Sequence, residues 1–425
     1  MIVEFMQRTS AANRLRFQVA GALGCALLPY LVRPLLPIVD PSATILLISL
    51  IGGVVASLLG MLFTRSIGGY PGAEGSAYIF PSFCISFGII LAIFFFFRID
   101  YSRSLFLICF ILNIILFYSL YFFTQRSNQL SVGVVLVGDT SRLLSVKNVH
   151  WVPLDTVDAD VNGLSAIAVD LRTDLPDEWD SRLADFALAG LPVYHSKHLQ
   201  ESLTGRVELE HLSENSFGSL SPVSAYMTFK HTADWLTALV AVILLMPVLL
   251  LISLLIILDS PGSPIFRQRR IGYRGRPFVV WKFRTMSVAA TDPSDSGDAR
   301  TAAMTSANDM RITRVGRFLR RSRLDELPQI INILKREMSW IGPRPEAEVL
   351  SQWYEAEIPF YRYRHIVRPG LSGWAQVSQG HVAEVDAVRD KLYYDFYYIK
   401  HFSPWIDILI IARTIRTMLT GFGAR

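Results

Sequence analysis

Two adjacent acidic residues, Asp325 and Glu326, follow six closely spaced arginines in the second half of this 425-residue chain. A carboxylate can attack a phosphoryl centre as a nucleophile, and guanidinium groups beside it would attract the phosphate. A solvated acidic pair balanced by surface arginines is the alternative, because ion pairs of structural origin are common. The residue types alone leave both interpretations open. The arginines are Arg311, Arg314, Arg317, Arg320, Arg321 and Arg323.

The pattern around the acidic pair predicts the start of a helix. Ser322 followed three residues later by Asp325 is typical of a capping box, so the pair is expected in the first helical turn. Apolar residues recur at helical spacing from Leu324 to Leu334, which predicts that this helix packs on a core. The positive end of the helix and the nearby arginines are expected to keep both carboxylates ionised.

A second basic group ends a short strand predicted at residues 278–281. Lys282 and Arg284 follow it, and residues two apart on a strand face the same side, so both could hold adjacent phosphate oxygens. A solvated basic strand edge is the alternative. Residues 287–308 are small, polar and dotted with acids, which predicts a mobile surface loop.

Five motifs in this half of the chain resemble those of the bacterial sugar transferases. These are the monotopic phosphoglycosyl transferases, which load a phospho-sugar onto polyprenyl phosphate. The motifs occur in the family's order, and the resemblance covers about residues 228–416. Any one motif alone would be weak evidence, but a chance match to all five is very improbable. They lie at residues 266–275, 281–286, 321–329, 339–345 and 368–377.

The resemblance implies a role for each matched residue. Asp325 would be the nucleophile that attacks the β-phosphate of a UDP-sugar, expelling UMP and forming an aspartyl-phosphosugar. Glu326 would help to bind Mg²⁺, which the family requires. The further side chains expected at the substrate are Lys282, Arg284, Arg320, Arg344, Arg368 and Gln376.

One motif departs from the family's pattern. Residues 334–339 read Leu-Lys-Arg-Glu-Met-Ser, where the family commonly has Leu-Lys-Gly-Asp-Met-Ser. The missing glycine, at Arg336, predicts a different local turn. The acidic pair keeps the pattern, as does the loop in which Pro343 and Pro345 flank Arg344.

The composition predicts a membrane component, because 51% of the residues are hydrophobic and only 18% are charged. Residues 1–224 carry 14 basic and 18 acidic residues, whereas residues 225–425 carry 27 and 18. A basic half suits an anionic membrane surface or a polyphosphate substrate. Nucleic acid is not expected, because no nucleic-acid module is recognisable. The three cysteines show no metal-ligand spacing and no disulfide framework.

Four apolar segments open the chain, each near the length of about 20 residues that crosses a bilayer. Residues 1–125 are therefore expected to form a four-helix transmembrane region. Basic residues near the N-terminus favour a cytoplasmic start, although Arg98 and Arg103 argue mildly for the opposite orientation. The segments are residues 15–37, 43–63, 77–97 and 104–123.

Residues 126–224 resemble the Rossmann-like middle domain of the larger family members. The sequence predicts buried parallel strands at 132–138, 166–170 and 191–194, with a helix at 178–189. Gly138 and Thr140 do not belong to a G-x-G-x-x-G fingerprint, so cofactor binding is not supported. A structural or oligomer-forming module is expected, and the likeness implies a homodimer.

A fifth apolar segment, at residues 236–258, precedes the motifs and is long enough to span a bilayer. Pro247 at its centre removes a helical hydrogen bond, and both flanks are basic. After four crossings, a fifth would carry the basic domain outside, away from cytoplasmic nucleotide sugars. The sequence therefore predicts a re-entrant helix over 232–258 that bends at Met246 and Pro247, as in the family. A kinked spanning helix is the alternative.

These observations predict a membrane protein with an α-helical N-terminal bundle, an α/β Rossmann-like domain and a mainly α-helical monotopic catalytic domain at residues 225–425. The expected location is the bacterial inner membrane, with the catalytic domain on the cytoplasmic face. The expected reaction transfers a sugar 1-phosphate from a UDP-sugar to polyprenyl phosphate, as the first membrane step of a surface polysaccharide. An inactive scaffold of polysaccharide assembly is the alternative.

Overall fold

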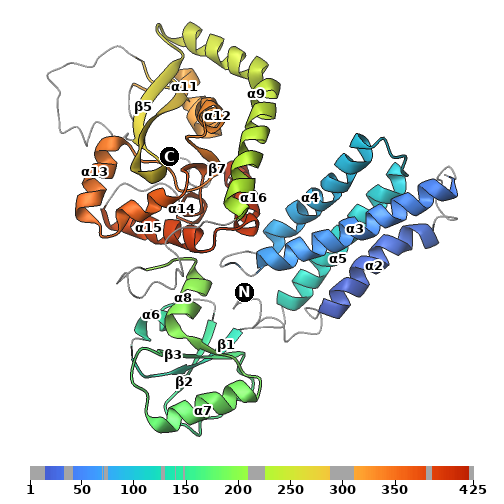
Figure 1. Ribbon diagram of the computed structural model, residues 1–425, viewed down its shortest axis with the longest axis vertical. Coiled ribbons are helices and arrows are strands. Elements are labelled where there is room, and N and C mark those ends of the chain that lie inside the picture. The colour runs from blue at the N-terminus through green and yellow to red at the C-terminus, as the bar shows by residue number, and fades with distance from the viewer. Residues whose placement is uncertain are drawn as a thin grey trace. The chain divides into compact units, whose positions relative to one another are not determined.

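A computed structural model of the chain divides into two compact units, Met1–Gly205 and Arg206–Arg425. The N-terminal unit holds four apolar helices and a small sheet, and the C-terminal unit holds the longest helix and all five motifs (Figure 1). The predicted loop at 287–308 lies almost entirely outside the described residues. Those are 15–32, 42–68, 70, 75–125, 130–138, 140–146, 149–208, 225–287, 311–379 and 385–420.

Four helices form at the predicted apolar segments and pack on one another through a shared apolar core. Three of them are long and apolar enough to cross a membrane, whereas α2 has only 17 residues. Residues 33–37 of the first predicted segment lie outside the described residues. The helices are α2 (Leu15–Leu31), α3 (Ala43–Gly68), α4 (Gly75–Phe96) and α5 (Arg103–Gln125).

Glycines of α3 let the apolar helices approach closely. A Cβ atom on Gly52 would lie 2.4 Å from the Phe94 ring, and one on Gly60 would lie 2.5 Å from the Phe83 ring. Because lipid offers no hydrophobic drive between helices, close packing of small residues against large ones is a main source of their association.

The sheet of the N-terminal unit is parallel, with the strand order β2-β1-β3-β4. Helix α7 (Asp177–Leu188) packs on one face, while α6 (Ser141–Leu144) and α8 (Ser196–Thr204) pack on the other. The three predicted strands and the helix are thus confirmed, and edge strand β2 is an addition. Its Pro153 explains the omission, since proline is typical only of edge strands. The strands are β1 (Leu130–Val135), β2 (Val149–Leu154), β3 (Ala166–Val169) and β4 (Val193–His195).

The C-terminal unit is mainly helical, with two small two-stranded sheets that carry motif residues. An antiparallel hairpin pairs β5 with β6, and a short parallel ladder pairs β7 with β8. Its elements in order are α9 (Ala225–Asp259), β5 (Ile265–Ile271), η4 (Tyr273–Gly275), β6 (Pro277–Phe283), α11 (Arg314–Ser322), η5 (Leu324–Gln329), α12 (Ile330–Leu334), β7 (Ser339–Ile341), α13 (Glu348–Glu357), η6 (Tyr361–Ile366), β8 (Gly370–Ser372), α14 (Trp374–Ser378), α15 (Val385–Lys400) and α16 (Pro404–Thr420).

The longest element, α9, is a single helix of 35 residues. It continues through Pro247 and is visibly bent along its length (Figure 1), so the predicted bend does not interrupt the helix. Ala238, before the proline, is buried against α12 and β6, whereas Ile252 and Ile256, after it, are buried against α11 and β6. Both halves of α9 therefore rest on the same unit, and the remaining face is apolar and exposed.

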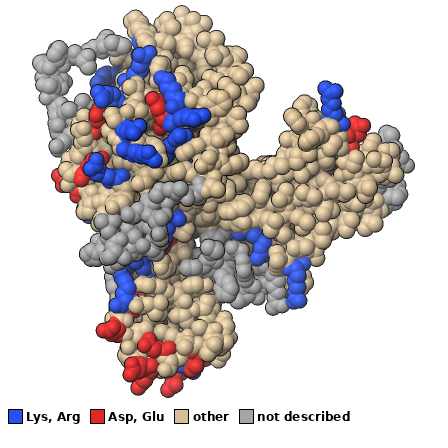
Figure 2. Space-filling view, viewed as in Figure 1, with Lys and Arg blue, Asp and Glu red and all other residues tan. Residues whose placement is uncertain are grey.

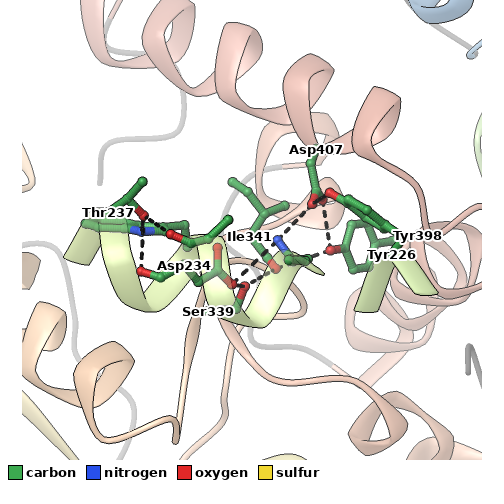
Figure 3. Close-up of polar contacts among 10 residues, drawn as sticks. Tyr226, Asp234, Thr237, Ser339, Ile341, Tyr398 and Asp407 are labelled. Carbon is green, nitrogen blue, oxygen red and sulfur yellow. Dashed lines mark hydrogen bonds and ion pairs between the residues drawn. The ribbon is translucent and has the colours of Figure 1, made fainter. Parts of the chain in front are cut away.

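A buried ion pair anchors the first turns of α9 to α16 (Figure 3). Lys230 Nζ lies 2.8 Å from Asp407 Oδ2, and both residues are only 6% exposed. The hydroxyls of Tyr226 and Tyr398 donate to the same carboxylate at 2.5 and 2.9 Å. A charge buried without its partner is costly, so this contact fixes where α9 begins.

Strand β7 lies between α9 and α15 and is bonded to both (Figure 3). The Ser339 hydroxyl donates to Asp234 of α9, and the Tyr398 hydroxyl of α15 donates to the carbonyl of Ile341 at 3.2 Å. The chain passes from β7 directly into the loop that contains Arg344. The long helix thus helps to position that loop.

We expect Asp407→Leu to destabilise the C-terminal unit by about 3 kcal/mol, because Lys230 keeps only a 3.9 Å contact with Asp234. The double variant Lys230→Met/Asp407→Leu should recover part of this loss, since no buried charge is left unpaired. Midpoints of thermal unfolding, measured in detergent, would test the difference. A double variant no more stable than Asp407→Leu would instead assign the loss to the two tyrosine hydrogen bonds.

Candidate active site

The acidic pair lies where one helix ends and a tighter one begins. Helix α11 ends at Ser322, Arg323 adopts a left-handed conformation with φ 59°, and the 3-10 helix η5 follows. The predicted capping box is wrong, because the Ser322 hydroxyl donates back to the carbonyl of Phe318 at 2.8 Å. Asp325 and Glu326 still occupy the first turn of a helix, as predicted.

Glu326 is buried between two cations from other segments. Its Oε1 lies 3.1 Å from Lys282 Nζ of β6 and 2.5 Å from Arg344 Nη2, while its Oε2 accepts from Arg344 Nη1 at 3.2 Å. Burial opposes ionisation, but Arg344 and Lys282 outweigh it and hold the pKa of Glu326 well below its usual range. Glu326 therefore stays ionised although it is only 7% exposed.

Asp325 has the opposite environment. Within the described residues its carboxylate makes no hydrogen bond or ion pair. Burial and the neighbouring charge of Glu326 raise the pKa of Asp325, so the two adjacent acids differ in how readily they lose their protons. A carboxylate without a cation in contact keeps its lone pairs available for attack on an electrophile.

Lys282 carries a charge that is sensitive to pH near neutrality. Burial lowers the pKa of this amine to about 8, with Arg344 and Arg270 adding to the effect and Glu326 opposing it. Lys282 is therefore held as a cation mainly by its contact with Glu326. A donor phosphate entering beside it would favour the same charged form.

Two arginines hold the loop after β7 by its backbone. Arg364 Nη2 donates to the carbonyl of Arg344 at 2.9 Å, and Arg270 donates to the carbonyl of Pro345. Sequence reasoning missed this support, and its only signal was that Arg270 falls within a motif. The same layer contains the buried Lys391 and Asp395 and the half-buried Glu346.

Glycines let two motif loops cross at close range. A Cβ atom on Gly370 would lie 2.1 Å from the backbone nitrogen of Gly342, and one on Gly373 would lie 2.3 Å from the carbonyl oxygen of Gly342. No other residue fits such a crossing without moving a backbone. These glycines therefore set the position of Arg344.

The loss of a glycine at position 336 does not remove the turn. Arg336 adopts a left-handed conformation with φ 62°, which glycine adopts without strain. The sequence predicted a different local turn, but the chain makes a turn of the kind that glycine favours.

Two arginines expected at the substrate are bonded instead to other parts of the chain. Arg284 is only 7% exposed and donates to the carbonyls of Ser260 and Pro261 at 2.5 and 2.7 Å, just past the end of α9. Its guanidinium thus fastens the helix end and does not share the position of Lys282. Arg320 Nε donates to the Thr285 hydroxyl at 2.9 Å, which ties α11 to the end of the hairpin.

Arg368 and Gln376 are not brought into contact with the acidic pair in the described part of the chain. Arg368 precedes β8, and burial lowers its pKa. Gln376 lies in α14, where its buried Oε1 accepts no hydrogen bond from the described residues. Both residues stay candidates for the outer part of a substrate pocket.

Asp325 and Glu326 could supply the carboxylates that a bound Mg²⁺ commonly takes from a protein. This ion commonly takes one or two carboxylates and completes its shell with substrate phosphates and water. No group of three metal-ligating side chains occurs among the described residues, so a dedicated metal cage is not built there. Glu326 and Asp325 are the residues that could hold the ion, and Glu326 would then share its oxygens with Arg344 and Lys282.

Comparisons with known proteins agree with these features of the site. The family model described as bacterial sugar transferase matches residues 225–421, which contain the acidic pair and every motif. A UDP-N-acetylgalactosamine-undecaprenyl-phosphate N-acetylgalactosaminephosphotransferase of Aeromonas hydrophila is 43% identical over 88% of this chain and 87% of its own length.

Two other relatives match less than half of the chain. A UDP-glucose:undecaprenyl-phosphate glucose-1-phosphate transferase of Escherichia coli is 41% identical over 44% of this chain and 39% of its own length. The exopolysaccharide production protein PSS of Rhizobium leguminosarum is 39% identical over 46% of this chain but 96% of its own length. The motifs, the site and a relative matched along nearly the whole chain agree: this chain belongs to the bacterial sugar transferase family.

Proposed function

We propose that the chain transfers a sugar phosphate from a UDP-sugar to undecaprenyl phosphate and releases UMP. One observation carries the proposal: a half-buried aspartate with no cation in contact stands beside a buried, ionised glutamate that binds two cations. This arrangement offers a nucleophile and a binding place for phosphate side by side. The names of the matched relatives describe the same reaction class.

The reaction proceeds through two displacements at one phosphorus atom. The Asp325 carboxylate attacks the β-phosphorus of the donor, an O–P bond forms, and the bond to the bridging oxygen breaks as UMP leaves. A phosphate oxygen of undecaprenyl phosphate then attacks the aspartyl-phosphosugar, which frees Asp325 and yields undecaprenyl diphosphate-sugar. The nucleophile must be ionised, and the positive charges around the donor favour that state.

Lys282 and Arg344 bind the charge of the diphosphate in this proposal. Glu326 orients both cations before the donor arrives, which reduces the cost of ordering them. Mg²⁺, held by Glu326 and the donor phosphates, would neutralise further charge on the diphosphate. Arg284 acts at a distance by fastening the end of α9.

The purified chain should release UMP from a UDP-sugar through many turnovers only when undecaprenyl phosphate is present, and only with Mg²⁺. Without the acceptor, release should stop at about one UMP per chain. A panel of UDP-sugars would identify the donor. No release from any donor would favour the alternative of an inactive scaffold.

Asp325→Asn should abolish transfer and leave the fold intact, because the amide has nearly the same shape but is a poor nucleophile. Wild-type protein given labelled UDP-sugar alone should carry the label on the chain, and Asp325→Asn should not. Residual turnover above about one hundredth of the wild-type rate would remove Asp325 from this role.

The pH profile should show two limbs. The pKa of Asp325 is raised, so kcat/KM should fall on acidification at a pH above the ordinary aspartate value of about 4. Lys282 loses its proton above about pH 8, so kcat/KM should fall again on the alkaline side as donor binding weakens. Lys282→Arg should remove the alkaline limb alone, because arginine stays charged. An unchanged alkaline limb would assign it to another group.

We further propose that α9 is re-entrant and that the C-terminal unit faces the cytoplasm. Both halves of α9 pack on one unit, and both of its ends make polar contacts with that unit, which suits a helix whose ends emerge on the same side. The parallel sheet at residues 130–195, proposed to be Rossmann-like, would serve assembly of a homodimer at the bacterial inner membrane.

Single cysteines at Phe229 and Arg362 would test this orientation. Phe229 is exposed near the start of α9, and Arg362 is exposed and follows α9 in the sequence. Both should react with an impermeant thiol reagent only after the cells are permeabilised. Labelling of one position, but not the other, in intact cells would show that α9 spans the membrane. The background lacks Cys25, Cys84 and Cys109.

A further inference from the structure

The chain that leaves the parallel sheet is fastened to α15 before it reaches the catalytic motifs. Helix α8 ends at Thr204, Gly205 follows in a left-handed conformation with φ 70°, and residues 206–208 already belong to the C-terminal unit. We call these three residues the strap. They precede residue 225, where the match to the bacterial sugar transferase family begins. The roles that the family resemblance implies therefore do not include them.

Arg206 holds the strap on α15. Its Nη2 pairs with the Asp390 carboxylate, and its guanidinium carbon lies 5.6 Å from the ring centres of both Tyr393 and Tyr394. A cation is attracted to the carboxylate and to the faces of both rings. The backbone N–H of Val207 donates to the carbonyl of Tyr393 at 3.0 Å, and Val207 is only 2% exposed. The strap is thus a packed part of the C-terminal unit.

The acids of α15 are specific partners on a unit that is rich in cations. Lys and Arg predominate over Asp and Glu where charge gathers on residues 225–420 in the view of Figure 2. Two acids of α15 each hold one arginine from another segment: Asp390 pairs with Arg206, and Asp395 lies 2.8 Å from Arg364. Helix α15 therefore joins the strap to the layer that supports the active site.

The same turns of α15 support the loop of Arg344. Arg364, held by Asp395, donates from Nη2 to the carbonyl of Arg344 at 2.9 Å. Lys391 pairs with Glu346 of the same loop. Lys391 and Asp395 are buried, and both lie within two helical turns of the residues that hold the strap. A shift of α15 at the strap would therefore reach the loop.

We propose that Arg206 is a positioning residue for the transfer reaction. By holding the strap on α15, it keeps the loop after β7 where Arg344 Nη2 lies 2.5 Å from Glu326 Oε1 and can bind the donor diphosphate. The effect on the donor rests on the proposed function, whereas the route from strap to loop rests only on contacts within the C-terminal unit. A chain that began at residue 225 would lack this support.

A surface ion pair that only stabilises the unit is the alternative. The side chains of Arg206 and Asp390 are 30% and 46% exposed, and ion pairs of this exposure contribute little to global stability. The two roles predict different results. Positioning changes α15 and the loop of Arg344 locally, whereas a purely stabilising role changes the unfolding of the whole unit.

Hydrogen exchange in the full-length chain, held in nanodiscs, measures the loop directly. Arg206→Met removes the guanidinium and keeps an apolar stem, and Arg206→Lys keeps the charge. The matched control is Arg182→Met in the N-terminal unit, because Arg182 lies 4.7 Å from the Phe186 ring and donates to the carbonyl of Val157 at 3.1 Å.

Arg206→Met should raise exchange several-fold in α15 and in residues 341–348, and Arg206→Lys should keep most of the protection. Arg182→Met should leave both segments unchanged. Unchanged exchange in residues 341–348, or an equal rise across the whole C-terminal unit, would overturn the inference.

The KM for the UDP-sugar should rise several-fold in Arg206→Met with little change in kcat, because Arg344 binds the diphosphate in both the ground state and the transition state. Asp390→Ala should act alike, and the double variant should be no worse than either single one, since both remove one contact. A lower kcat at an unchanged KM would overturn the positioning role. Faster exchange in residues 341–348 with unchanged kinetics would keep the support of the loop by the strap and remove Arg344 from donor binding in the proposed function.

Discussion

The buried charge of Glu326 is the constraint on which the rest of the site depends. Removing a carboxylate from water costs several kcal/mol unless cations and hydrogen bonds replace the solvent. Lys282 and Arg344 do so, but each must then be held in place itself. The hairpin fixes Lys282, and a second layer of buried charge around Arg364 fixes the backbone at Arg344. The order of the site thus follows from the need to keep one carboxylate ionised.

Helix α9 supports the active site as well as serving as a proposed membrane helix. Leu324 and Leu327, which bracket the acidic pair in sequence, pack in the same cluster as Ile252 and Ile256 of α9. The other end of the helix is tied to β7, which leads into the loop of Arg344. A change in how α9 sits in the bilayer would therefore reach both sides of the acidic pair. Anchoring and catalysis share one packed interior.

Periodic and local features of the sequence predicted much of this structure. The sequence did not predict which charged residues meet when they lie far apart along the chain. The apolar helices, three of the four parallel strands and the position of the acidic pair follow from spacing and residue type. The partner of each buried charge does not, because a lysine on a strand and an arginine in a distant loop give no local sign that they meet. Arg284 shows the same limit: its type suggested phosphate, but its neighbours in space are the carbonyls that follow α9.

The different environments of two adjacent acids follow from the geometry of η5. A 3-10 helix has about three residues per turn, so neighbouring side chains diverge by about 120°, more than in an α-helix. Glu326 can then contact Lys282 and Arg344, while the Asp325 carboxylate forms no ion pair with either of them. The left-handed turn at Arg323 begins η5 directly after α11, which leaves no room for a longer α-helical entry. One turn of tight helix thus gives one acid a permanent charge and leaves its neighbour available to react, and the charged neighbour in turn raises the proton affinity of the reactive one.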